Sequence, residues 1–94
     1  MTLLEQTYQT LRDVGLVRSA ADFSDTYLSR NRNWYSWQRH ACRDITVNAA
    51  IQCLRAVRAQ LRGNDLGVGQ RTALEATALA LQVHLLQHAI ADVC

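Results

Sequence analysis

The stretch from Arg30 to Arg43, RNRNWYSWQRHACR, concentrates positive charge and large rings more than any other part of the chain. It holds four arginines, one histidine and three aromatic residues, and no acidic residue interrupts it. Guanidinium groups pair with phosphates and base edges, and aromatic rings anchor or stack. These residue types indicate a surface that binds a polyanion, and nucleic acid fits the mixture best.

The charge of the whole chain supports such a surface on one side of the molecule. The formal net charge is only +2, and all ten basic residues are arginine. Residues 30–62 hold seven arginines and one acid, whereas residues 66–94 hold one arginine and two acids. This asymmetry indicates a polyanionic partner for the basic part. The alternative is an ordinary solvated charged face.

Helical segments are expected to carry these residues. The 94 residues contain no proline and four glycines, and good helix formers such as alanine, leucine and arginine are abundant. Thr2, Ser19 and Thr46 are expected to cap helices, and Gly15 is expected to end the first one. The predicted fold is all-α, with about five helices at residues 2–14, 19–28, 31–40, 46–62 and 70–93.

The expected organisation is a single domain, residues 1–94. Residues 1–62 form the binding core, Gly63–Gly69 a loop, and residues 70–94 a long C-terminal helix. That helix has two apolar stripes, one of which can pack on the domain, and the sequence leaves open which one; the first consists of Leu74, Ala78, Leu81 and Leu85. The other predicts a homodimer interface, formed by Leu79, Val83, Leu86, Ile90 and Val93. The alternative is a helix buried on most sides within one chain.

The segment from Phe23 to Gln38 resembles the helix-turn-helix of Cro/C1-type phage and plasmid repressors. Phe23 and Ser24 match the apolar-small pair that opens the motif. Trp34 and Trp37 match the buried pair of its second helix, and Gln38 follows where the family often has glutamate. The resemblance implies a helix-turn-helix in the middle of the chain.

The same resemblance implies binding to double-stranded DNA, with the second helix of the motif in the major groove. The two tryptophans then form its apolar back. The side chains expected to face bases are Asn31, Arg32, Tyr35 and Ser36. Those expected at phosphates are Arg30, Arg39 and Arg43. The turn departs from the family at Leu28, which stands in place of the usual glycine.

The function expected from these observations is sequence-specific DNA binding by a small bacterial or phage transcriptional repressor or autoregulator, acting as a homodimer. A second hypothesis is that the protein is a helical protein–protein interaction module, such as a phage-encoded inhibitor or a regulatory adaptor. Tryptophan, tyrosine and arginine are enriched in protein-binding hot spots too. A third hypothesis is that the protein binds nucleic acid without sequence preference.

No catalytic residue, metal, cofactor or small-molecule substrate is expected. His84 and His88 have a spacing that metals use, but no third ligand is evident. His40 and Cys42 lack a base–nucleophile–orienter set. No apolar run reaches membrane-spanning length, no secretory signal is recognisable, and the three cysteines lack CxxC spacing. The expected location is therefore the cytoplasm, with no membrane partner.

Overall fold

The computed structural model describes the backbone of residues 2–63 and 65–93 and the side chains of residues 2–63 and 65–87. The described backbone is helical, with no strand. Its helices are α1 (Leu3–Asp13), α2 (Ala20–Thr26), α3 (Trp34–His40), α4 (Val47–Leu61) and α5 (Val68–Val93). The predicted all-α fold with about five helices is confirmed.

Hydroxyl side chains begin three of the helices, as predicted. Thr2, Ser19 and Thr46 each accept a hydrogen bond of 3.2 Å from the backbone N–H three residues later. Such a cap stabilises a helix by about 1 kcal/mol. At the start of α3, Asn33 makes no side-chain cap. Instead, Asn31 Oδ1 accepts from the Asn33 N–H at 2.9 Å, which holds the preceding turn.

The first three helices are each followed by one residue in the left-handed conformation. These residues are Gly15, Ser29 and Cys42, with φ of 77°, 52° and 56°. The N–H of the next residue then donates to a carbonyl oxygen in the last turn of the helix, at 2.9–3.0 Å. These bonds satisfy carbonyl groups that the helix itself leaves unpaired. Gly15 is predicted by its residue type, whereas Ser29 and Cys42 are not.

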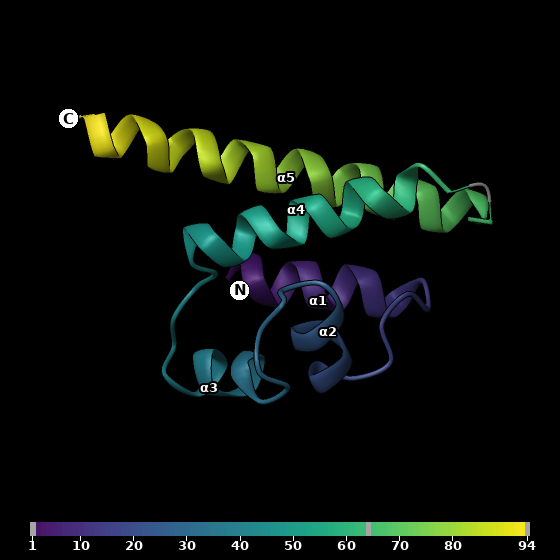
Figure 1. The fold of residues 1–94 in the computed structure, drawn as a ribbon, viewed down its shortest axis with the longest axis horizontal. Coiled ribbons are helices and arrows are strands. Elements are labelled where there is room, and N and C mark those ends of the chain that lie inside the picture. Colours follow the sequence, from purple (N-terminus) through teal and green to yellow (C-terminus); the bar gives the residue numbers. More distant parts are fainter. Residues whose placement is uncertain (1, 64, 94) are drawn as a thin grey trace.

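The helices stack in an ordered way (Figure 1). α4 and α5 run side by side, and α1 lies between this pair and the smaller helices α2 and α3. α5 has 26 residues, which corresponds to about 39 Å. That length accounts for the longest dimension of the molecule, 41 Å. No helix among the described residues is both long and apolar enough to cross a bilayer.

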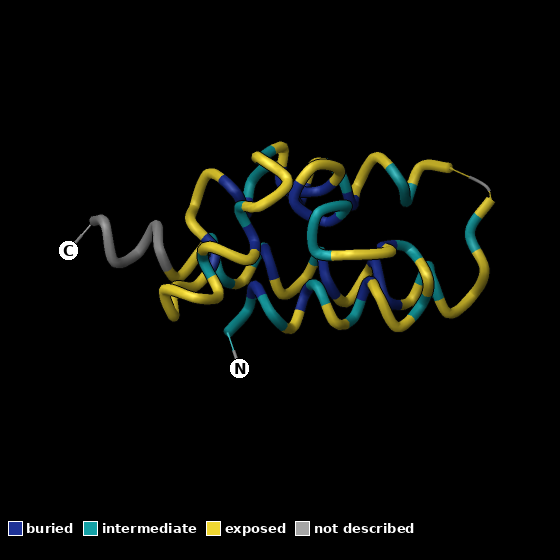
Figure 2. The backbone as a smooth tube through the Cα atoms, turned by 90° about the horizontal axis from the view of Figure 1, so that it is seen from below, coloured by how far each residue is buried: buried dark blue, intermediate teal, exposed yellow. Residues whose placement is uncertain are grey.

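The core begins with an aromatic cluster beneath α1. The rings of Tyr8, Phe23, Tyr27 and Tyr35 contact one another at centroid distances of 4.7–6.1 Å. Phe23 of α2 is buried, as are Tyr27 and Leu28, which follow the helix. Buried positions alternate with exposed ones along each helix (Figure 2). Burial of one face therefore positions every helix.

α5 completes this core. Leu74 and Leu81 are fully buried, and Ala78 and Leu85 are half-buried against them. Of the two apolar stripes predicted on the last helix, this is the one that packs on the domain. The helix starts at Val68, inside the segment predicted as a loop. Because α5 packs on both α4 and α1, the first 62 residues alone would leave an apolar face open to water.

Candidate nucleic-acid interface

α3 turns a different face to the core from the one predicted. Tyr35 is 3% exposed, and its ring centroid lies 4.7 Å from that of Tyr8 and 5.7 Å from that of Phe23. Trp37 is 59% exposed, and Trp34 is half-buried. Tyr35 therefore cannot face bases, and Trp37 does not anchor the helix. Both predictions are wrong.

The buried positions of α3 lie one residue later than those that the resemblance to the repressors implies. The buried Tyr35 and the half-buried Gln38 lie one position after the tryptophans that the pattern assigns to the core. The left-handed residue of the turn is likewise Ser29, one position after Leu28. Leu28 itself is fully buried. Tyr35 is held in the core by its ring contacts with Tyr8 and Phe23 and by the hydrogen bond that its backbone N–H donates to Ser24 Oγ.

The outward side of α3 remains polar and basic. Four side chains of the helix are exposed to solvent, namely Ser36, Trp37, Arg39 and His40, and the preceding loop adds Asn31, Arg32 and Asn33. Three of the four residues predicted to face bases, Asn31, Arg32 and Ser36, are therefore exposed. Arg32 Nη1 lies 3.8 Å from Asp25 Oδ2, and both side chains are about two-thirds exposed. Such a pair is weak and exchanges readily.

The arginines predicted to bind phosphate border this side. Arg39 and Arg43 are exposed, and Arg30 is half-buried with its guanidinium carbon 5.7 Å from the centre of the Trp34 ring. This stacking holds the guanidinium plane in place. Asp44 is the one acid of residues 30–62. It accepts hydrogen bonds from the backbone N–H groups of Leu4 and Ile45 at 3.0 and 2.7 Å. Its carboxylate is thus engaged in joining the α3–α4 connector to α1.

Two open grooves are lined by basic side chains, one by residues of α3 and the other by the turn that precedes α3, and no carboxylate lines either of them. The first, the α1–α3 groove, has a volume of about 520 Å³; its basic side chains are Arg12, Arg39 and His40. The second, the α4 groove, has a volume of about 450 Å³ between the turn after α2 and α4; its basic side chains are Arg30 and Arg55. Arg12 and Arg55 were not predicted as site residues. Both residues are far from α3 in the sequence, so the sequence gives no sign that they line these grooves.

Burial and neighbouring charges change the pKa of Tyr35, which lines the α1–α3 groove. Burial raises the pKa of its hydroxyl, and the positive charge of Arg39 opposes that effect. Glu5 also raises this pKa, but less than Arg39 lowers it. The phenol therefore keeps its proton at neutral pH and can donate a hydrogen bond.

A second surface lies on the outer side of α5. Leu79, Val83 and Leu86 are 62%, 46% and 64% exposed. They form an apolar stripe on the side of the helix opposite the buried Leu74 and Leu81. The other two residues predicted for the dimer interface, Ile90 and Val93, lie outside the residues whose side chains are described.

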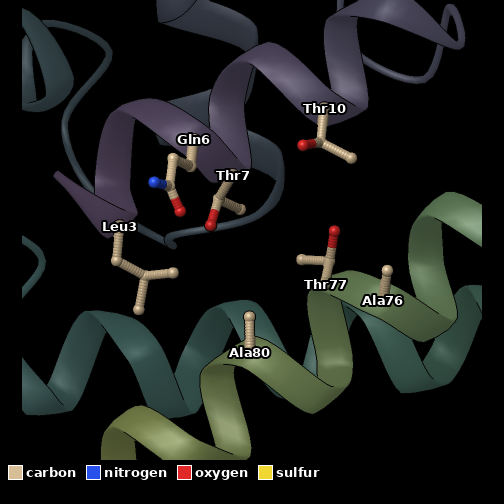
Figure 3. A pocket seen from close by; sticks show the side chains of 7 residues that line it. All are labelled: Leu3, Gln6, Thr7, Thr10, Ala76, Thr77 and Ala80. Carbon is tan, nitrogen blue, oxygen red and sulfur yellow. The ribbon is translucent and has the colours of Figure 1, made fainter. Parts of the chain in front are cut away.

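A small pocket lies between α1 and α5, which pack on each other (Figure 3). Its volume is about 90 Å³, and side chains of both helices line it, including Thr7, Thr10 and Thr77. The Thr77 hydroxyl points across the pocket toward α1. It is buried and has no hydrogen-bond partner among the described residues. A buried hydroxyl without a partner carries a desolvation cost.

Comparison with known proteins places the chain in a family. We found no significant match among curated proteins or among solved structures. A family match covers residues 4–94, which is nearly the whole length. The chain therefore belongs to the family of unknown function DUF6626.

Proposed function

We propose that this protein binds double-stranded DNA through α3 and acts in the cytoplasm as a small transcriptional repressor or autoregulator. The observation that carries the proposal is the outward side of α3. Ser36 and His40 are exposed there, exposed arginines border them, and the nearby carboxylates of Asp25 and Asp44 already hold partners. The exposed pair of Arg32 with Asp25 is weak, so a polyanion can displace Asp25 from Arg32, and the surface that remains is basic.

The contact set follows the corrected orientation of α3. Ser36 lies one position after the buried Tyr35 and is central to the exposed side. Its hydroxyl can donate to or accept from base edges, and Arg32 can pair bidentately with guanine. Trp37 and His40 replace Tyr35 as the outward rings of the set.

The short length of α3 is compatible with this role. Seven residues span about 10 Å, close to the ~12 Å width of the major groove. In helix-turn-helix proteins the N-terminal residues of the second helix make the base contacts. The loop residues Asn31 and Arg32 and the first turn of α3 would supply them.

The DNA-binding unit that we propose is a homodimer formed through the outer stripe of α5. Residues 76–87 contain no arginine, aspartate or glutamate. A second copy docked on Leu79, Val83 and Leu86 would therefore meet no repelling charge, and burial of these side chains would stabilise the pair. Sedimentation of Leu86→Glu tests the interface against wild type. We expect a dimeric wild type and a monomeric variant; a monomeric wild type, or an unchanged mass for the variant, contradicts the proposal.

A selection from random duplexes at low salt tests the DNA-binding role. We expect the wild type to enrich a defined sequence, and Arg32→Ala combined with Ser36→Ala to relax it. Arg58→Ala is the matched control, because Arg58 is exposed on α4 and lines neither groove. If the wild type enriches no sequence, the repressor proposal fails.

The exposure of Trp37 favours a second candidate, a protein-binding module. An exposed tryptophan among arginines has the composition of an interface hot spot. On this proposal, Trp37→Ala abolishes binding to a protein partner, and the duplex selection enriches nothing.

A further inference from the structure

We infer that the α1–α3 groove and the α4 groove are phosphate-binding sites that hold the two strands on either side of α3. Arg12 and Arg55 then become backbone contacts. This inference rests on the proposed DNA binding and extends it, because it names the group that each groove binds and adds two residues from outside the helix-turn-helix segment.

The α1–α3 groove brings together two guanidinium groups that are far apart in sequence. Arg12 comes from α1 and Arg39 from α3. Arg12 Nη1 donates to Tyr8 Oη at 3.4 Å, and its guanidinium carbon lies 5.9 Å from the centre of the Tyr8 ring. These contacts orient the side chain and use one of the five N–H donors that a guanidinium carries. Its remaining donors suit the oxygens of a phosphate group.

The wall between the two arginines is aromatic and can donate hydrogen bonds. The Tyr8 and Tyr35 rings contact each other at 4.7 Å, and the Ser36 hydroxyl adjoins them. The carboxylate of Glu5 does not line the groove. Glu5 raises the pKa of Tyr35 less than Arg39 lowers it. An anion in this groove would therefore meet donors and positive charge.

The α4 groove has the same chemistry. Arg30 and Arg55 are its charged groups, and the hydroxyl and amide groups of Ser29, Asn48 and Gln52 supply neutral polar neighbours. Arg30 is held by stacking on Trp34. Each groove therefore pairs one arginine of the predicted phosphate set with one arginine from a more distant helix.

The α1–α3 groove is lined by α3 itself, whereas the α4 groove is lined by α4 and by the turn before α3. The Arg30 guanidinium of that turn stacks on the ring of Trp34 in α3. Trp34 and Arg39 are five positions apart, which corresponds to about 140° around a helix. Ser36 and Trp37 lie between these two residues in the sequence and are exposed to solvent. A helix in the major groove has a phosphate strand on each side, about 12 Å apart. Two open, acid-free grooves, one lined by Arg39 and the other by Arg30, fit that arrangement better than they fit a single small ligand.

The test measures how the dissociation constant of a labelled mixed-sequence duplex depends on salt, between about 50 and 200 mM. Each lost phosphate contact should lower the slope of log Kd against log salt by about 1. We expect this for Arg12→Gln and for Arg55→Gln, and a decrease of about 2 for the double variant. Arg12→Lys keeps the charge and should keep the slope.

Arg18→Gln and Arg58→Gln are matched controls, because both arginines are exposed and neither lines a groove. Their slopes should equal that of wild type. If Arg12→Gln and Arg55→Gln also keep the wild-type slope, the grooves do not hold backbone phosphates, while DNA binding itself stands. Circular dichroism of each variant establishes that it folds.

A titration with inorganic phosphate, followed by NMR, separates a polymer site from a small-ligand site. We expect weak shifts at Tyr8 and Arg12 in the wild type and none in Arg12→Gln, together with duplex binding. Shifts with inorganic phosphate but no duplex binding would overturn the assignment to a nucleic-acid backbone. An absence of duplex binding by the wild type would overturn the proposed function as well.

Discussion

The backbone N–H of Tyr35 donates a hydrogen bond to Ser24 Oγ over 3.0 Å, and both residues are buried. Ser24 in turn donates to the Ala20 carbonyl oxygen, also at 3.0 Å. Tyr35 lies in the first turn of α3, where N–H groups have no partner within their own helix. Ser24 therefore caps α3 from the neighbouring helix. This bond helps set which side of α3 faces the core and leaves Ser36 exposed.

Ser24→Ala should destabilise the protein, because it leaves the buried Tyr35 N–H without an acceptor. The expected loss in the free energy of unfolding is about 1–3 kcal/mol, measured by urea denaturation. Ser36→Ala removes an exposed hydroxyl one position further on and should change stability by less than about 0.5 kcal/mol. Equal stabilities for the two variants would show that the Ser24–Tyr35 bond contributes little.

Cys42→Gly should stabilise the protein. Cys42 is exposed and has a φ of 56°, which costs a residue with a Cβ roughly 1–2 kcal/mol. Glycine relieves that cost but loses more backbone entropy on folding, so we expect a net gain of about 0.5–1 kcal/mol. Cys42→Ala removes the thiol and keeps the strain, and it should bring no gain. A thermal melt of both variants decides the matter; equal melting temperatures would argue against strain at this position.

Thr77→Val should raise the melting temperature. The substitution replaces a buried hydroxyl that has no partner among the described residues with a methyl group of similar size. A gain of about 1 kcal/mol corresponds to roughly 4–8 °C in a domain of this size. Thr72→Val is the control, because the exposed Thr72 hydroxyl donates to the Val68 carbonyl oxygen at 3.0 Å. A lower melting temperature for Thr77→Val would mean that this hydroxyl is hydrogen-bonded in solution.

Stability should fall at alkaline pH. Burial raises the pKa of the Cys53 thiol and of the Tyr27 hydroxyl to about 12 in each case. The unfolded chain releases these protons near pH 8.5 and 10, so it binds fewer protons than the folded chain above those values. The contribution of both groups is complete below about pH 8.5 and is lost as pH rises toward 12.

Urea midpoints measured across this pH range test the effect. Cys53→Ala should flatten the decline between about pH 8.5 and 10, where the unfolded thiol is the group that titrates. The same decline in wild type and variant would rule out Cys53 as its source.

The helices and their caps could be predicted from the sequence because short-range interactions decide them. The hydroxyls of Thr2, Ser19 and Thr46 bond to N–H groups three residues away. The apolar spacing of Phe23 and Leu28 identifies the buried side of α2 and of the turn that follows it. Neither kind of signal needs information from another helix.

The orientation of α3 could not be predicted in this way. The helix has only seven residues, and Trp34, Tyr35 and Trp37 are all large rings, so its spacing does not single out one face. The choice depends on Ser24 in α2 and on the ring of Tyr8 in α1. Ser29 takes the left-handed conformation in the turn before α3, and its residue type gives no sign of this.

The sequence by itself determined an all-helical chain, its caps, a basic middle segment and two apolar stripes on the last helix, because residue type and helical period encode these features locally. Only the tertiary structure decided that Tyr35 is buried while Trp37 is exposed, that Arg12 and Arg39 line the same groove, and that Leu81 faces inward while Leu86 faces outward. Each of these outcomes depends on packing between segments distant in the chain, and a local pattern carries no information about it.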